Sequence, residues 1–245
     1  MRKILFTLSF CLLYSGIAFS QINAVSDRIA VNKLIDVPEN SVRVAVDQKT
    51  DRMYYSSFWD GKINEVENYR TSPSSKEIAN SNDHGIITQM GGMTIHDGIM
   101  YIAGSIDSDS DDNVIGVVKK ANLAENPLNW VTVLTTNPYP KSNTAFDHRI
   151  NNVEVGPDGN FLYINSGSRT DHGEEHGGFR EVPLTAKIFK IPIDAENLVL
   201  ENDEEALAPY VFAEGTRNMF GFAWDNQGNM FATENAGDRD HPEEL

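Results

Sequence analysis

The sequence has almost no cysteine, since Cys11 is the only one among its 245 residues. A chain without cysteine pairs cannot be a disulfide-stapled scaffold, so its stability has to come from a hydrophobic core. Long apolar runs are scarce as well. Beyond residue 20, none approaches the roughly 20 apolar residues that a membrane-spanning helix needs. Neither a disulfide framework nor a membrane-spanning helix is therefore expected in that part of the chain.

Basic residues are also few, because 20 Lys and Arg stand against 36 Asp and Glu, for a formal net charge of −16. Such a charge repels phosphate backbones and anionic lipid surfaces, so nucleic-acid and membrane-surface partners are not expected. Glycine-rich phosphate loops, a dinucleotide fingerprint and a serine nucleophile elbow are lacking too, which removes support for nucleotide chemistry. A neutral small molecule or a cation remains compatible with this composition.

The first residues have the pattern of an export signal. Residues 2–3 are basic, residues 4–18 are apolar, and residues 18–20 form a small-x-small cleavage site. We predict that residues 1–20 are a cleavable signal peptide and that the mature protein is periplasmic or secreted.

One unit recurs along the rest of the chain: two short alternating strands joined by a turn rich in Gly, Asp and Asn. Its four copies are residues 42–55, 92–103, 153–163 and 220–233. Three copies are followed by a further β-rich segment, at residues 61–66, 113–118 and 186–193. The pattern shows no long helical periodicity.

Units of about four short strands at this spacing predict an all-β fold, a β-propeller. A β-sandwich is the alternative, and the repeat disfavours it. The last hairpin is followed by only a short tail. We therefore expect residues 41–245 to form an incomplete propeller of about four blades, truncated at the C-terminus, with residues 21–40 as a lead-in segment.

An acid beside an imidazole precedes the third hairpin, where Asp147 and His148 lead into its first strand. Histidine has an unperturbed pKa of about 6.5, which suits proton acceptance near neutral pH. A surface or capping histidine would have the same sequence, so the pair by itself leaves both interpretations open.

Two motifs resemble the soluble glucose/sorbosone dehydrogenase family, six-bladed propellers that bind pyrroloquinoline quinone and calcium. His148 precedes Gly-Pro-Asp-Gly at residues 156–159 by the family's distance, and residues 215–221 read Gly-Thr-Arg-Asn-Met-Phe-Gly. A weaker match is Gln89, which stands ahead of two glycines. The resemblance implies a quinoprotein dehydrogenase that oxidises an aldose sugar at C1 by hydride transfer to the quinone.

The resemblance also implies roles for single residues. His148 would be the catalytic base, with Asp147 beside it, and Arg217 would stabilise the negative charge that develops on the reduced quinone. The other candidates are Asn218, Gln89 and Arg169 for cofactor binding, together with Arg217, and Gly237 and Asp238 for Ca²⁺. Neither a particular sugar nor an electron acceptor is assigned from the sequence.

The sequence departs from the family at two places. Ser168 follows Gly167 where the family usually has Asp, so the carboxylate that would orient the base is missing there. Asp147 or Asp171 is the candidate replacement. Residues 236–238 read Ala-Gly-Asp where the family has Gly-Pro for the calcium carbonyls.

Two other functions remain open: a non-catalytic secreted propeller that binds carbohydrate or protein, and a calcium-dependent lactonase-type hydrolase. Residues 172–176 read His-Gly-Glu-Glu-His, but zinc peptidases need this pattern on a helix, which the neighbouring glycines disfavour. The acidic run at residues 107–113 lacks the Gly and Glu that complete a calcium loop, which favours an exposed turn.

Overall fold

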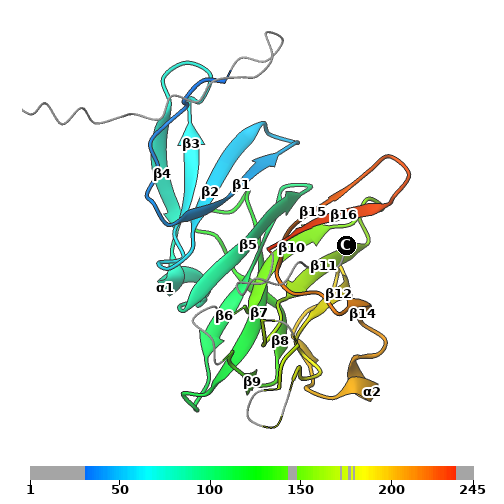
Figure 1. Cartoon of the computed structure of the whole chain (residues 1–245). Coiled ribbons are helices and arrows are strands. Elements are labelled where there is room, and N and C mark those ends of the chain that lie inside the picture. The colour runs from blue at the N-terminus through cyan, green and yellow to red at the C-terminus, as the bar shows by residue number, and fades with distance from the viewer. Residues whose placement is uncertain (1–30, 143–147, 172, 176–177, 179, 236–245) are drawn as a thin grey trace, which may run out of the picture. The chain divides into compact units, whose positions relative to one another are not determined.

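The computed structural model describes residues 31–142, 148–171, 173–175, 178 and 180–235. The described residues from Ile35 onward form one compact unit. The regular structure of the described residues is nearly all β, as Figure 1 shows. Within these same residues, no helix has the length and apolar character to cross a membrane.

The first sheet is a four-stranded antiparallel meander. Its strands, in order, are β1 (Ser41–Asp47), β2 (Arg52–Ser57), β3 (Ile63–Glu67) and β4 (Ser74–Ala79). Helix α1 (Ser81–His84) follows and begins at a capping box. The Asn80 side chain accepts from the Asn82 N–H at 2.9 Å, and the Asp83 carboxylate accepts from the Asn80 N–H at 2.8 Å. This cap fixes the chain's turn toward the second sheet.

The second sheet takes one strand from a later repeat. Its consecutive strands are β5 (Gln89–His96), β6 (Ile99–Asp107), β7 (Asn113–Asn122) and β8 (Val131–Thr136), with β9 (Tyr139–Pro140) pairing to β7. Strand β13 (Leu198–Leu200) adds to β8 in parallel. Because β13 belongs to the third repeat, this pairing fastens two consecutive sheets together.

The third sheet has four strands, and the fourth has two in the described part of the chain. The third runs β10 (Ile150–Val155), β11 (Phe161–Ser166), β12 (Lys187–Pro192), β14 (Val211–Glu214), with helix α2 (Glu204–Leu207) before β14. The fourth is the antiparallel pair β15 (Met219–Trp224) and β16 (Met230–Glu234).

All four predicted hairpins are confirmed, as β1–β2, β5–β6, β10–β11 and β15–β16. The three predicted β-rich segments form β3, β7 and β12. The β5–β6 turn shows the local cause, because Asp97 and Gly98 have φ of 50° and 78°, the left-handed pair that tight hairpins require. Consecutive, mainly antiparallel sheets of this kind confirm the all-β, propeller-like architecture (Figure 1).

Two hydrophobic cores lie between successive sheets, and β6 contributes to both. Met100 and Ile102 face the core shared with the first sheet, whereas Tyr101 and Ala103 face the core shared with the third sheet. This alternation follows from the two-residue period of a strand, and burial of both faces makes β6 apolar throughout. The second sheet is thus the packed middle layer to which its neighbours attach.

Arg43 connects the first strands of all four hairpins. From β1, its Nε donates to the Gly91 carbonyl of β5 at 2.6 Å, and its Nη2 donates to the Asn151 carbonyl of β10 at 2.9 Å. Its guanidinium carbon also lies 4.1 Å from the centre of the Phe220 ring of β15, a cation–π contact. Burial lowers the pKa of Arg43 to about 10, and the nearby Glu154 carboxylate opposes that shift.

His84 ties the first sheet to the segment that leads into β5. Its Nδ1 accepts from the Ile86 N–H at 3.1 Å, and its Nε2 lies 2.8 Å from the Gly61 carbonyl. These partners require a neutral ring with its proton on Nε2. Burial lowers the pKa of His84, and the Gly61 carbonyl partly opposes this shift.

We expect this histidine to make stability fall in mild acid. The unfolded imidazole takes up a proton at about pH 6.5 and the folded one only at lower pH, so the unfolded state binds more protons as the pH drops. Urea unfolding of the wild type and of His84→Gln at about pH 7.5 and about pH 5.5 measures the effect. The variant should lose less stability across this window, and an equal loss in both proteins would contradict the assignment.

Candidate functional site

The candidate residues lie at one end of the third sheet. His148 lies two residues before β10, Gly167 directly follows β11, and Arg217 lies two residues before β15. Strands β10 and β11 are antiparallel, so the start of one lies beside the end of the other. Strands β10 and β15 are in contact, which brings the third of these positions to the same end.

Gly167 is the point where the predicted base and the predicted arginine meet. A Cβ atom on Gly167 would lie 2.5 Å from the His148 Cβ and 3.2 Å from the Arg217 carbonyl oxygen. The Ser168 N–H donates to the same carbonyl at 2.5 Å. Because a side chain has no space here, the glycine allows both residues to pack against one stretch of backbone.

The Arg217 guanidinium is held by a buried ion pair with Asp171. Their side chains are 8% and 5% exposed, and Nη2 lies 2.5 Å from the Asp171 Oδ1. Nε lies 3.2 Å from both Oδ1 and the Asp171 carbonyl, and Nη1 donates to the Asn235 carbonyl at 2.9 Å. The Glu234 carboxylate accepts from the Arg217 backbone N–H. Asp171, a candidate to orient the base, thus uses its carboxylate to orient the arginine.

Asn218 ends a row of buried amides. The Asn165 Nδ2 donates to the Asn151 Oδ1 at 2.8 Å, and the Asn151 Nδ2 donates to the Asn218 Oδ1. The row runs from β11 across β10 to the residue before β15. The row occupies the side-chain Oδ1 of Asn218, so the side-chain NH₂ is the group with which Asn218 would contact an oxygen of a ligand.

The other predicted binding residues have different settings. Gln89 is the first residue of β5 and is partly buried, two residues before Gly91, which packs against Asn151. Arg169 is 7% exposed, and its backbone N–H donates to the Glu181 carboxylate at 2.8 Å.

The predicted calcium ligands and the acid beside the base fall outside the described residues; they are Gly237, Asp238 and Asp147. His172 and His176 of the zinc-like motif fall outside them too. Among the residues that the structure does describe, no three His, Cys, Asp or Glu side chains gather as a metal site.

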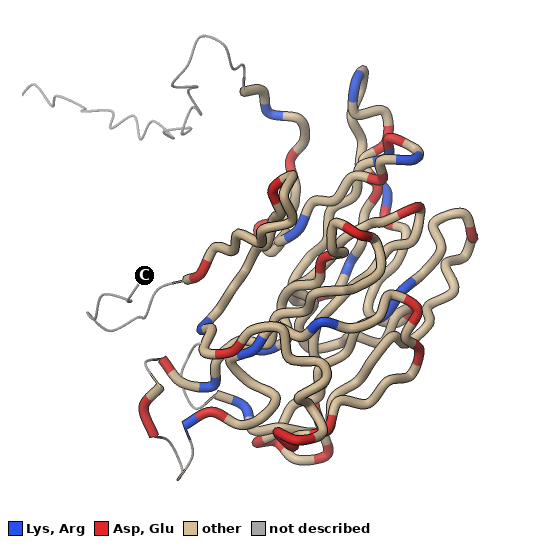
Figure 2. The backbone as a smooth tube through the Cα atoms, turned by 90° about the vertical axis from the view of Figure 1, so that its right-hand side faces the viewer, with Lys and Arg blue, Asp and Glu red and all other residues tan. Residues whose placement is uncertain are grey.

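Four cationic side chains are buried at the same end of the third sheet. They are Arg149, Arg169, Lys187 and Arg217, each at most 8% exposed. Acidic residues outnumber basic ones in the chain, and Figure 2 marks both kinds along the backbone. Lys187 contacts exposed acids, with Nζ 3.2 Å from Glu204 and 3.7 Å from Glu214. Buried cations around a backbone junction suit an anionic ligand, and the quinone, which carries carboxylates, has that chemistry. These residue types suit the carboxylates of the quinone, although Lys187 and Arg217 are already paired with acids.

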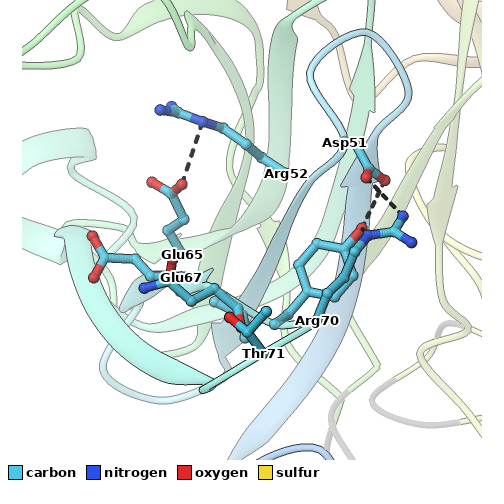
Figure 3. A pocket seen from close by; sticks show the side chains of 9 residues that line it. Asp51, Arg52, Glu65, Glu67, Arg70 and Thr71 are labelled. Atoms are coloured by element: carbon cyan, nitrogen blue, oxygen red, sulfur yellow. Dashed lines mark hydrogen bonds and ion pairs between the residues drawn. The ribbon is translucent and has the colours of Figure 1, made fainter.

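A hollow of about 420 Å³ on the first sheet is separate from the candidate site around Gly167 (Figure 3). Arg70 pairs with Asp51 at 2.7 Å, and the Arg52 Nε lies 3.4 Å from the Glu65 carboxylate. The hollow lies by the β1–β2 turn, where β1 ends, whereas His148 precedes the start of β10. Exposed pairs of this kind contribute little to stability and do not converge on one ligand position.

Three solved structures are similar to this one. An oxidoreductase of Thermus thermophilus, named as a glucose dehydrogenase, has a TM-score of 0.55 and 14% identity, over 82% of this chain and 60% of that one. The pyrroloquinoline quinone domain of a Coprinopsis cinerea pyranose dehydrogenase has a TM-score of 0.55 and 17% identity, over 84% of this chain and 46% of that one. A Trichoderma reesei carbohydrate-active enzyme of family AA12 has a TM-score of 0.54 and 15% identity, over 84% of this chain and 48% of that one.

The chain shares their fold. At these identities the similarity concerns the fold and not the activity. The chain spans about half the length of these proteins. No protein-family model and no curated protein matches the sequence.

Sequence reasoning missed Glu181, Asn151 and Arg43. Glu181 lies in a polar connection without a motif, and Asn151 is one of two adjacent asparagines in a strand, with no signal for which one faces Asn218. Arg43 had no usable signal, because it alternates with Val42 and Val44, and that pattern by itself places the arginine on the solvent face. In the structure Val44 is the exposed residue instead, at 68%.

Proposed function

We propose that this protein belongs to the glucose/sorbosone dehydrogenase family and oxidises an aldose at C1 with pyrroloquinoline quinone and calcium as cofactors. The junction at Gly167 carries the proposal, because it brings His148 beside the backbone of Arg217, whose guanidinium pairs with Asp171. The two sequence motifs and the fold shared with proteins named as glucose and pyranose dehydrogenases support it.

His148 is the proposed base in this scheme. Its imidazole accepts the proton of the C1 hydroxyl while the C1 hydrogen leaves with its electron pair, so the aldose becomes a lactone. When bound, the quinone supplies the two-electron acceptor for that hydride. The packing of His148 against Gly167 limits where the ring can lie, which favours one approach of the sugar.

Arg217 is proposed to face the oxygens that gain charge on reduction. A guanidinium stays protonated and presents N–H donors in a fixed plane, so it stabilises a developing oxyanion without moving. The Asp171 carboxylate fixes that plane and also neutralises part of the charge. Asn218 adds an amide donor beside it, and Gln89 and Arg169 are proposed to contact the cofactor.

Removal of the base is the direct test. Purified protein is titrated with the quinone in the presence of Ca²⁺, followed by absorbance, and dye-linked oxidation is then measured over a panel of aldoses. We expect His148→Ala to lower the rate by about 10²–10⁴-fold, because general base catalysis contributes that much, while the quinone still binds.

His96→Ala is the matched control. His96 is the last residue of β5 and lies near Asp97 at 3.8 Å, at the end of the strand away from Gln89, so its loss should leave the rate unchanged. Wild-type protein that gives no absorbance change with quinone and calcium and oxidises no aldose would remove the proposal.

One observation favours a non-catalytic propeller that binds carbohydrate or protein. Ser168 occupies the position of the family's orienting carboxylate, and its Oγ donates to the Thr170 carbonyl at 2.7 Å instead of holding the base. Under this alternative, a sugar binds without oxidation, and His148→Ala changes no rate in the presence of quinone.

We also propose export of the protein. The motivation is the basic start and apolar run of residues 1–20. N-terminal sequencing of the protein recovered from a bacterial envelope fraction should begin at Gln21, and a sequence that begins at Met1 would contradict cleavage.

A further inference from the structure

Four donors converge on the carboxylate of Glu181. Its Oε2 accepts from the Arg169 N–H at 2.8 Å and from the Thr185 hydroxyl at 2.7 Å. Its Oε1 accepts from the Thr170 N–H at 3.1 Å and from the Thr170 hydroxyl at 2.6 Å. An ionised carboxylate has about four acceptor positions, so these contacts match its capacity.

The donors come from two segments that flank one connection. Arg169 and Thr170 follow β11, and Thr185 precedes β12, so Glu181 joins the two ends of the β11–β12 connection. The Thr170 hydroxyl also accepts from the Gly173 N–H at 3.0 Å, which extends the fixed backbone past Asp171. Thr170 and Thr185 are 2% and 1% exposed, so water competes little for these bonds.

The residue after this clamp is the partner of the candidate arginine. Asp171 follows Thr170 directly and contacts the Arg217 side chain through both its carboxylate and its carbonyl. The direction of the Asp171 side chain depends on the backbone that Glu181 holds. A shift of that backbone would turn the guanidinium, because Asp171 contacts both its Nε and its Nη2.

We infer that Glu181 is a positioning residue, which fixes the backbone of Arg169 and Thr170 and through the following Asp171 sets the orientation of Arg217 toward an anionic ligand. The ligand part of this inference rests on the proposed function, whereas the clamp on the backbone does not. Glu181 acts here through Asp171 and Arg217, and the ligand contact belongs to the arginine.

Glu181→Gln tests the clamp with little change in shape. Glutamine offers one acceptor oxygen and one NH₂ group, so either the Arg169 N–H or the Thr170 N–H faces a donor. By hydrogen exchange, we expect the amides of Arg169 and Thr170 to exchange about tenfold faster than in the wild type, given the strength of hydrogen bonds to charged groups. The dissociation constant of the quinone, with Ca²⁺ present, should rise by a similar factor.

Thr185→Val is the matched control. It removes one donor to Glu181 and the acceptor of the Val182 N–H, and leaves the bonds to Arg169 and Thr170 in place. It should lower the melting temperature about as much as Glu181→Gln without changing quinone affinity, which separates positioning from general stability. Glu205→Gln, on the exposed side of α2, should change neither property.

Hydrogen exchange and quinone affinity together show which part of the inference fails. Unchanged exchange at the Arg169 and Thr170 amides in Glu181→Gln would overturn the clamp. Faster exchange with unchanged quinone affinity would overturn the link to Arg217. If the wild type binds no quinone, the proposed function fails, and the exchange result still supports or overturns the clamp by itself.

Discussion

Arg43→Met should lower the free energy of unfolding by about 3–5 kcal/mol, the largest effect on stability that we expect from a single side chain. The methionine keeps the apolar stem of the side chain but has no guanidinium, so it donates no hydrogen bond and loses the cation–π contact with Phe220. The carbonyls of Gly91 and Asn151 then lose a charged donor. Urea unfolding at neutral pH measures the loss.

Part of this loss comes from Glu154. Burial raises the pKa of Glu154, and the Thr94 hydroxyl and the Arg43 charge both hold it down. The Thr94 Oγ1 donates to the Glu154 carboxylate at 2.7 Å. Without Arg43, a partly buried carboxylate loses the positive charge that offsets its desolvation. We therefore expect Glu154→Gln to recover part of the stability of the Arg43→Met protein.

Arg52→Met gives the matched control on the adjacent strand. Arg52 pairs with Glu65 at 3.4 Å, but its side chain is 53% exposed, and exposed ion pairs contribute about 0–1 kcal/mol. The two arginines therefore differ mainly in what surrounds them. A similar small loss of stability in both variants would show that Arg43 does not link the first strands of the four hairpins.

The hairpins were predictable from the sequence because their signals are local. Turns such as Asp97-Gly98 require residues that tolerate positive φ, and the flanking strands alternate with the period of two. The parallel pairing of β13 with β8 has no such signal. It joins Leu198 to Leu134 across a long stretch of chain, and only the packing of the second and third sheets decides it.

The candidate site divides in the same way. His148, Arg217 and Asn218 belong to short motifs that stand in the sequence, so they could be named without coordinates. Their surroundings could not, because Asp171 meets Arg217 and Asn151 meets Asn218 only when three strand ends converge. Ser168 shows the limit clearly: the missing carboxylate was visible, but the use of Asp171 for the arginine was not.

A large loss of function that leaves the base itself in place is expected from Gly167→Ala. The added methyl group would lie 2.5 Å from the His148 Cβ and 3.2 Å from the Arg217 carbonyl, and both contacts are with atoms close to the backbone. Relief requires His148 to move away from Arg217 by a fraction of an ångström or more. A misplacement of about 1 Å lowers rates by about 100-fold, and we expect a loss of that order in dye-linked aldose oxidation.

Gly156→Ala separates this effect from crowding alone. Its Cβ atom would lie 2.6 Å from the Tyr163 ring, a clash as close as that at Gly167, but at the opposite end of β10 and β11. Overpacking costs about 1–3 kcal/mol, so both variants should lose comparable stability. Only Gly167→Ala should lose activity, because only that methyl group separates the base from the arginine. Equal activity in the two variants would mean that the closeness of His148 and Arg217 plays no part in the reaction.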